Sequence, residues 1–201
     1  MLPATTHRSL RSDRPGRLSA EDWAQAALEV IAEQGVAAVA VEPLARRLNV
    51  TKGSFYWHFP SRDALLQAAL ERWETAEQET VFGKLEAISD PRERLRSLFL
   101  LVADDFTSHV VYNELLKALD HPIVSPVIGR VSQRRLEYLT ASFRQAGLAR
   151  TTARHRARLA YAAYVGFLQL NRQMREQRMQ QEEFQDYVAH VMDTLIPTPA
   201  T

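Results

Sequence analysis

The residues best suited to chemistry lie between positions 52 and 62. Lys52 and Arg62 carry positive charge, and Tyr56, Trp57 and His58 form a run of rings with polar tips between them. Ammonium, hydroxyl and imidazole groups can bond phosphate oxygens, and the carbon edges of rings can contact thymine methyl groups in a DNA major groove. These residue types at this spacing favour contact with DNA.

A helix-turn-helix would position these side chains. Leu44 and Leu48 predict a short helix that starts near position 42 and stops at Asn49, a residue that tolerates a left-handed backbone. The next helix starts at 52–54 and places Phe55 and Phe59 inward, four residues apart. The rings at 56–58 then lie outside the core, where a partner is expected to cover them.

Two longer helices complete this unit. Ser19 and Asp22 have the spacing of an N-terminal capping pair and Gly35 supplies a stop, which predicts a helix over about 19–34. Ser61 is a good N-cap for a helix that runs towards Phe82.

Apolar residues recur at intervals of three and four through most of the chain, so we predict an all-α fold. The expected organisation is a basic flexible arm (1–18), a small helix-turn-helix unit (19–60) and a larger helical body (61–197). Within the body, helices are expected over about 91–109, 112–119, 122–147, 152–179 and 184–195.

Composition excludes several classes of protein. The 201 residues include 25 Lys plus Arg, 24 Asp plus Glu and no Cys, which rules out a disulfide framework, a thiolate metal site and a Cys nucleophile. GxSxG, GxGxxG, P-loop, HExxH and paired Glu-x-x-His motifs are absent, so we expect no enzyme activity, catalytic residue, metal or cofactor. No apolar stretch approaches the ~20 residues of a membrane span or follows the basic start as a secretion signal, and we expect a cytoplasmic protein.

Positive charge gathers in three segments. The first 18 residues hold four Arg, among them Arg14 and Arg17, and residues 44–59 hold three cations and no acid. Residues 144–178 hold eight Arg and one acid. The first two segments could lie on a polyanion, whereas the third could be a solvated helix face or part of a subunit interface.

The stretch LARRLNVTKGSFYWHFPSRDALL resembles the TetR family of bacterial transcriptional regulators. The family signature is a helix-turn-helix that ends in an aromatic, aromatic, His, Phe run, followed by Lys or Arg and a Leu-rich fourth helix. The resemblance covers about residues 19–70 and implies a three-helix DNA-binding domain, a helical ligand-binding and dimerisation domain, and a symmetric dimer. The implied function is a repressor that releases a palindromic operator when a small molecule binds the C-terminal domain.

Carried over residue by residue, the resemblance implies DNA-binding roles for nine residues. Lys52, Gly53 and Ser54 match base-approaching positions, and Tyr56 and His58 match phosphate-contacting positions. Trp57 matches an aromatic residue on the DNA backbone or a thymine methyl, Arg62 matches a basic phosphate anchor, and Arg14 and Arg17 would add contacts from the arm.

Two positions depart from the family pattern. Asn49 stands where Gly is commonest in the turn, and Val41 stands where Ser or Thr often caps the following helix. The second helix is therefore expected to fray slightly.

Several side chains of the body are candidates for an effector cavity, although each could instead fill the core. They combine rings with polar tips and are Trp73, Phe99, Phe106, His109, Tyr112, Asn113, Tyr138, Phe143 and Tyr164. As a set they predict an effector that is uncharged or weakly charged and aromatic or amphipathic.

The last two helices predict a homodimer, with packing inside one chain as the alternative. Small residues such as Ala163 and Gly166 on one helix would face an apolar stripe on the other, and two such pairs would form a four-helix bundle. Two recognition helices about 34–36 Å apart would then reach successive major grooves. The other functions weighed are an ordinary helical hairpin at 41–66 and a protein–protein adaptor without DNA binding.

Overall fold

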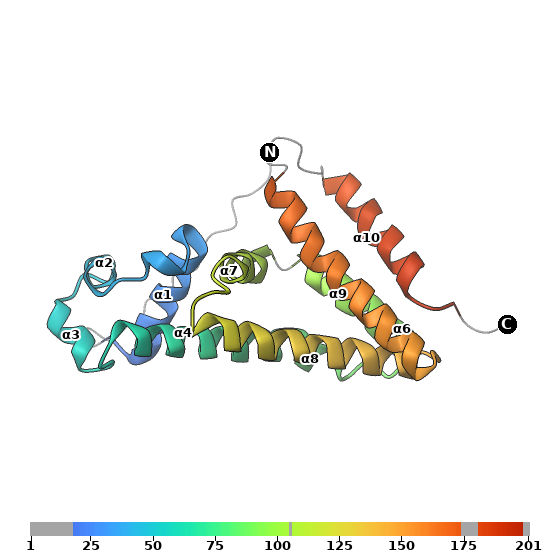
Figure 1. The fold of residues 1–201 in the computed structure, drawn as a ribbon, viewed down its shortest axis with the longest axis horizontal. Helices are drawn as coiled ribbons and strands as arrows, with labels where there is room; N and C mark the ends of the chain where they lie inside the picture. The colour runs from blue at the N-terminus through green and yellow to red at the C-terminus, as the bar shows by residue number, and fades with distance from the viewer. Residues whose placement is uncertain (1–17, 105, 174–180, 199–201) are drawn as a thin grey trace.

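The computed structural model describes residues 18–104, 106–173 and 181–198, and these residues form helices and no strands (Figure 1). The predicted all-α fold is confirmed. In order along the chain the elements are α1 (Ala20–Gln34), η1 (Val36–Ala38), α2 (Val41–Arg47), α3 (Lys52–Tyr56), α4 (Arg62–Glu77), η2 (Gln78–Phe82), α5 (Gly83–Leu85), α6 (Pro91–Asp104), α7 (Phe106–Leu116), α8 (Val124–Gln145), α9 (Arg150–Gln173) and α10 (Gln181–Leu195).

Local signals begin and end the first helix as predicted. The Ser19 side chain accepts a hydrogen bond from the Asp22 backbone, and the Asp22 carboxylate accepts one from the Ser19 backbone at 2.7 Å, which makes a capping box. Gly35 ends the helix with φ +86°, a left-handed value that other residues rarely adopt. In α2 the N-cap is Ala40, which makes no side-chain capping bond, and Val41 already lies inside the helix.

The helix after Ser61 runs from the helix-turn-helix unit into the body of the molecule (Figure 1). Ser61 Oγ accepts from the backbone amide of Ala64 at 3.1 Å, and α4 runs directly into the π-helical segment η2 and the short α5. A π segment inside an α-helix is rare and is frequently found at functional sites.

The body departs from the prediction between positions 104 and 112. One helix over 91–109 and a short one over 112–119 were expected, but α6 ends at Asp104 and α7 already starts at Phe106. In α7, Val111, Tyr112 and Leu115 pack into the core beside α1 and α4. That packing depends on residues far away in sequence, which helical periodicity does not reveal.

Two clusters of buried side chains form the core. The first joins α1–α4 to α7 and the start of α8, with Trp23, Phe55, Leu66, Trp73 and Tyr112 among its members. The second joins α6, the end of α8, α9 and α10. In Figure 1 the long helices α4 and α8 connect the end of the molecule that holds α1–α3 with the end that holds α9 and α10.

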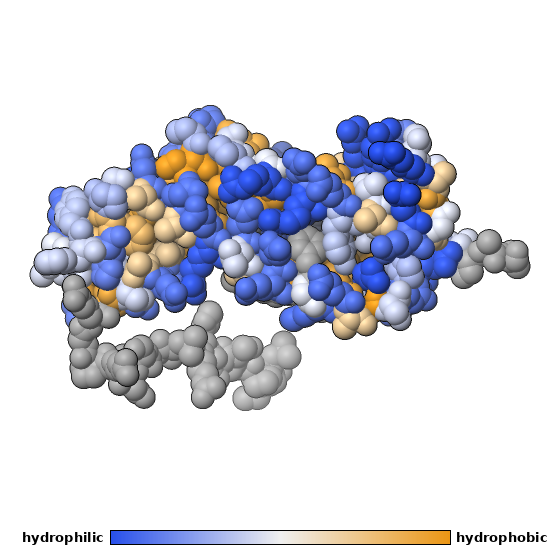
Figure 2. Space-filling model, turned by 90° about the horizontal axis from the view of Figure 1, so that it is seen from below, coloured by the Kyte–Doolittle hydropathy of each residue, from blue (hydrophilic) through white to orange (hydrophobic). Residues whose placement is uncertain are grey.

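The surface seen in Figure 2 is mostly hydrophilic, with hydrophobic residues in separate patches. Over the described part of the chain, none of the helices combines the length and the apolar composition that crossing a membrane requires.

Candidate functional site

The helix α3 is locked onto the rest of its unit by one face. Phe55 is completely buried and meets the buried ring of Trp23 edge-on, with 5.3 Å between ring centroids. Phe59 lies on the same side, with 5.8 Å between its ring centroid and that of Phe55. These contacts confirm the predicted inward pair, and they fix which face of α3 points outward.

The turn between α2 and α3 has the conformation expected from its sequence. Asn49 adopts φ +55°, and it is the one described residue other than glycine with a positive φ. The Val50 amide donates to the Ala45 carbonyl at 2.9 Å, and the Val50 side chain packs against the first core cluster. The left-handed residue thus reverses the chain between the two helices.

Ion pairs hold α2 against α1 and α3. Arg47 donates to both carboxylate oxygens of Glu33 at 2.7 Å and reaches Glu29 at 3.2 Å. Its hydrogen bonds hold the pKa of Glu33 below the ordinary value. Lys52, the first residue of α3, lies 2.8 Å from Glu42 of α2, and this hydrogen bond raises the pKa of Lys52 and lowers that of Glu42. Arg47 therefore has a structural role, because it joins two carboxylates of α1 to α2.

The outward face of α3 carries large rings in solvent. Trp57 is 78% exposed and Tyr56 is 56% exposed, although aromatic side chains usually gain free energy from burial. Lys52 and Gly53 are exposed on the same short helix, and Ser54 is half-buried. A Cβ atom on Gly53 would meet nothing closer than Thr51 Oγ1 at 3.7 Å, so the fold itself does not require glycine there.

Two residues that the resemblance implies as phosphate contacts also have surroundings within the protein. The Nε2 atom of His58 is enclosed without a hydrogen-bond partner, so a contact from this ring to phosphate would use Nδ1. The guanidinium of Arg62 points into the protein: Nε donates to the Val39 carbonyl and Nη2 to the Val36 carbonyl, each at 3.0 Å. Its Nη1 lies 3.1 Å from Asp63. Arg62 therefore braces the segment between α1 and α2, and its contact with phosphate stays a prediction. Arg14 and Arg17 lie outside the described residues.

A cavity of about 80 Å³ lies in the body, between α4, α6, α7, α8 and α9. Four of the predicted residues border it: Phe99, His109, Tyr138 and Tyr164. The rest of its wall is Glu77, Val81, Leu98, Val102, Arg135, Leu139, Ala160 and Tyr161.

The other predicted cavity residues lie elsewhere. Trp73 stacks on Tyr112, with 6.0 Å between ring centroids, and both belong to the first core cluster. Phe143 is completely buried in the second cluster, and Asn113 is half-buried away from the cavity wall. The side chain of Phe106 lies outside the described part of the structure.

Hydrogen bonds order the polar rings near the cavity. Tyr112 and Tyr161 share a hydrogen bond of 2.5 Å between their hydroxyls, and Tyr161 also lies 2.9 Å from Ser132 Oγ. His109 Nε2 contacts the Val102 carbonyl, and its Nδ1 lies 2.8 Å from the Tyr164 hydroxyl. Burial raises the pKa of Tyr112 and Tyr164, so both remain protonated at neutral pH.

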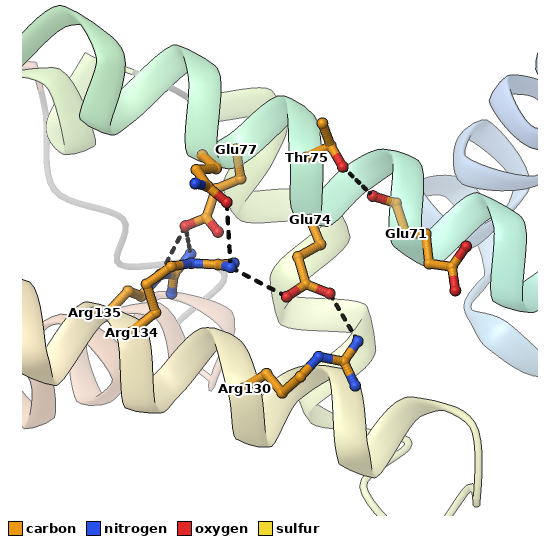
Figure 3. A network of polar contacts seen from close by, with 8 residues as sticks. Glu71, Glu74, Thr75, Glu77, Arg130, Arg134 and Arg135 are labelled. Atoms are coloured by element: carbon orange, nitrogen blue, oxygen red, sulfur yellow. Dashed lines mark hydrogen bonds and ion pairs between the residues drawn. The ribbon is translucent and has the colours of Figure 1, made fainter.

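A ladder of ion pairs joins α4 to α8 beside the cavity (Figure 3). Glu74 lies 2.8 Å from Arg130 and 3.2 Å from Arg134, and Glu77 lies 2.6 Å from Arg135. The Arg135 guanidinium also lies over the ring of Tyr112, 4.3 Å from its centroid. The innermost pair, Glu77 and Arg135, borders the cavity.

Sequence reasoning missed both residues of this innermost pair, although a signal was present. Buried Leu66, Leu70 and Trp73 follow one another at steps of four and three on α4, and Glu77 occupies the next position of that stripe. On α8, Arg135 stands between buried Val131 and Leu139, four residues from each. A charged residue inside an apolar stripe indicates a buried partner or a ligand.

The last two helices use part of their apolar surface inside the chain. Ala160 and Leu195 are buried in the second core cluster, and Phe167 of α9 contacts Phe184 and Tyr187 of α10 at 5.3 Å between ring centroids. Large apolar side chains of α9 remain exposed, namely Leu159 at 57% and Leu170 at 55%.

The fold and the outward face of α3 define a helix-turn-helix protein, and comparisons specify its kind. Residues 25–69 match the family described as bacterial regulatory proteins, tetR family. The HTH-type transcriptional regulator SrpR of Pseudomonas putida is 31% identical over 47% of this chain and 51% of its own length. The uncharacterized HTH-type transcriptional regulator TtgW of the same species is 31% identical over 81% of its length, and BetI of Burkholderia lata is 30% identical over 66% of this chain and 71% of its own.

Solved structures share the fold across most of the chain. A transcriptional regulator from Rhodococcus has a TM-score of 0.75 at 19% identity and covers 89% of this chain and 96% of its own. The reduced form of Escherichia coli NemR has a TM-score of 0.74 at 19% identity, with 90% and 99% covered. A regulator from Saccharomonospora viridis, solved in complex with choline, has a TM-score of 0.74 at 19% identity, with 87% and 93% covered.

The chain belongs to the TetR family of bacterial regulatory proteins. Its match with SrpR spans about half of that relative's length. The relatives are HTH-type transcriptional regulators, which is the class that the helix-turn-helix unit predicts.

Proposed function

We propose that this protein is a ligand-responsive transcriptional repressor that binds a palindromic operator through α3. The observation that carries the proposal is the exposure of Tyr56 and Trp57 beside Lys52, on a helix whose opposite face is fixed by buried Phe55. An exposed aromatic face next to a cation suits a DNA major groove, where phosphates flank the base edges.

Each residue of this face has an expected role. Lys52, Gly53 and Ser54 approach the bases, the Tyr56 hydroxyl donates to a phosphate oxygen, and Trp57 lies on the sugar–phosphate backbone or a thymine methyl. The pair between Lys52 and Glu42 lies in solvent, where an ion pair contributes little to stability, so Lys52 can exchange Glu42 for DNA.

The effector site of the proposal is the cavity bordered by Phe99, His109, Tyr138 and Tyr164. One helix links the two sites, because α4 starts beside the helix-turn-helix at Arg62 and ends at the cavity wall with Glu77. A ligand that moves α4 would change the separation of two recognition helices, and a hundredfold loss of operator binding requires a preference of about 2.7 kcal/mol for the released state.

A homodimer through α9 and α10 completes the proposal. Exposed Leu159 and Leu170 supply apolar area on α9. A twofold axis would place two α3 helices on one face of a duplex and match an inverted repeat.

Selection of binding sites from random duplex DNA tests this function. The full chain is expected to enrich an inverted repeat and to bind it with an affinity that falls steeply as salt rises, because Lys and Arg release counterions from the phosphates. Failure to enrich any sequence, or binding indifferent to salt, would refute the proposal and leave the exposed rings to another partner.

A further inference from the structure

Two charged side chains border the otherwise mainly apolar cavity, and they pair with each other. Arg135 donates to Glu77 Oε1 from Nε at 2.7 Å, and Nη2 lies 2.6 Å from the same oxygen. The exposed fraction of the side chain is 14% for Arg135 and 3% for Glu77. Burial alone would lower the pKa of Arg135, but the neighbouring carboxylate of Glu77 contributes to raising it overall, so Arg135 stays positively charged.

Each partner of this pair has an atom left over. Glu77 Oε2 and Arg135 Nη1 are enclosed and have no hydrogen-bond partner. An enclosed polar atom without a partner is unfavourable, and structures normally satisfy it. The wall around the pair combines apolar side chains such as Val81 and Leu98 with the hydroxyl groups of Tyr161 and Tyr164, and a ligand in the cavity that the pair borders could supply the missing partner.

The charges already present select against an ionic ligand. Arg135 occupies the aromatic faces, 4.3 Å from the ring centroid of Tyr112 and 5.5 Å from that of Tyr164, where a ligand cation would otherwise bind. A ligand anion would meet the buried carboxylate of Glu77. Either ion would add an unpaired charge to a buried site whose own charges are matched, which is strongly unfavourable.

We propose that the cavity binds an uncharged molecule that carries a hydroxyl group on an apolar body of about one ring. The inference rests on the proposed function, which makes this cavity the effector site. A hydroxyl can donate to Glu77 Oε2 or accept from Arg135 Nη1, and no net charge enters the cavity. The apolar body packs against side chains such as Leu98, Phe99 and Val102.

Size supports a small ligand. The cavity measures about 80 Å³. An engineered cavity of roughly 150 Å³ admits benzene, so a single ring already requires some expansion of this one. Larger ligands would require the ladder between α4 and α8 to open.

Four probes of nearly equal shape test the ligand class: benzyl alcohol, toluene, benzylamine and benzoate. Dissociation constants are measured by NMR titration of the full chain without DNA at neutral pH, where benzylamine is a cation and benzoate an anion. Benzyl alcohol is expected to bind about tenfold more tightly than each of the other three, because a hydrogen bond to a charged group is worth about that factor. Equal or tighter binding of toluene, benzylamine or benzoate, or no binding of any probe, overturns the inference.

A pair of variants locates the preference at the ion pair. Removing one partner leaves a buried charge and can unfold the protein, whereas replacing both by apolar residues is often tolerated. The double variant Glu77→Leu with Arg135→Met is therefore expected to bind toluene within about twofold of the parent, and to lose the tenfold advantage of benzyl alcohol. The matched control Glu74→Gln breaks the neighbouring pairs of the ladder without touching the cavity wall, and is expected to keep that advantage. Persistence of the advantage in the double variant, or its loss in the control, overturns the assignment to this pair.

The two proposals fail in distinguishable ways. If random-site selection yields an operator but the four probes bind equally, the ligand class is wrong and the repressor function stands. If benzyl alcohol is preferred but no operator is selected, the ligand class stands and the repressor function is wrong.

Discussion

The guanidinium of Arg62 lies against the ring of His121, with 3.4 Å between Arg62 Nη1 and His121 Nε2. Arg62 is the first residue of α4, and His121 precedes α8. Together with the hydrogen bonds from Arg62 to the Val36 and Val39 carbonyls, this contact joins the helix-turn-helix unit to the body at one side chain. Movement of α4 would therefore displace the segment that directly precedes α2.

Arg62→Lys is expected to destabilise the protein by about 2 kcal/mol, because an ammonium group cannot reach both carbonyls as the planar guanidinium does. Urea unfolding followed by circular dichroism measures the change. The control Asp63→Asn removes an exposed partner of the same arginine, and should change stability by less than about 0.5 kcal/mol. A lysine variant as stable as the parent would show that Arg62 does not brace the α1–α2 segment.

Gly53→Ala should separate DNA binding from folding. A Cβ atom at this position meets only Thr51 Oγ1 at an ordinary 3.7 Å, so stability should stay constant or rise by up to about 1 kcal/mol. Affinity for the selected operator should nevertheless fall by about tenfold or more if the backbone of α3 approaches the bases closely. Gly129→Ala, at an equally open position on α8, should leave operator binding unchanged, and a loss there would point to a general effect of the added methyl group.

Tyr56→Phe removes one hydroxyl from the exposed face and keeps the ring beside Phe55. Operator affinity is expected to fall about tenfold, since the lost hydrogen bond is to a charged phosphate. The salt dependence of binding should keep its slope, whereas Lys52→Ala should reduce the slope by about one. Fluorescence anisotropy at several salt concentrations measures both, and unchanged affinity for Tyr56→Phe would remove this residue from the interface.

Asn49→Ala is expected to lower the free energy of unfolding by about 1–2 kcal/mol, because an alanine at φ +55° suffers the steric penalty of the left-handed region. Asn49→Gly should have a free energy of unfolding within about 0.5 kcal/mol of the parent, since glycine adopts this conformation freely. Thermal or urea unfolding compares the two variants. Equal destabilisation by both would mean that the asparagine side chain, and not its backbone, stabilises the turn.

The contribution of the α1 capping box to the stability of the protein should depend on pH. Hydrogen bonds from the backbone and side chain of Ser19 hold the pKa of Asp22 below its ordinary value. A carboxyl whose pKa is lower in the folded state stabilises the protein above its unfolded pKa of about 4, and loses this contribution as pH falls through the folded pKa. The stability difference between the parent and Asp22→Asn should therefore be constant near neutral pH and shrink below about pH 4.

Unfolding of both proteins between neutral and acid pH measures that difference. At neutral pH, Ser19→Ala should cost about 1 kcal/mol, the usual value for a lost N-cap. A parent-to-variant difference that grows on acidification would contradict the assigned direction of the pKa shift.

Much of the helix-turn-helix unit could be predicted because its signals are local. The cap at Ser19, the stop at Gly35 and the left-handed Asn49 each depend on residues within about five positions, and the inward spacing of Phe55 and Phe59 is set by the helical repeat. The run Tyr56, Trp57 and His58, which follows Phe55, carries the resemblance to the family and can be read from the sequence directly.

Tertiary structure alone decided what the charged residues do. Arg62 donates to the Val36 and Val39 carbonyls because η1 brings them to it, and its place in the sequence does not reveal these partners. Glu77 and Arg135 are 58 residues apart and meet only because α4 and α8 lie side by side. Helical periodicity specifies which face of each helix is inward, but the partner of an inward charge depends on how the helices pack, which no local pattern encodes.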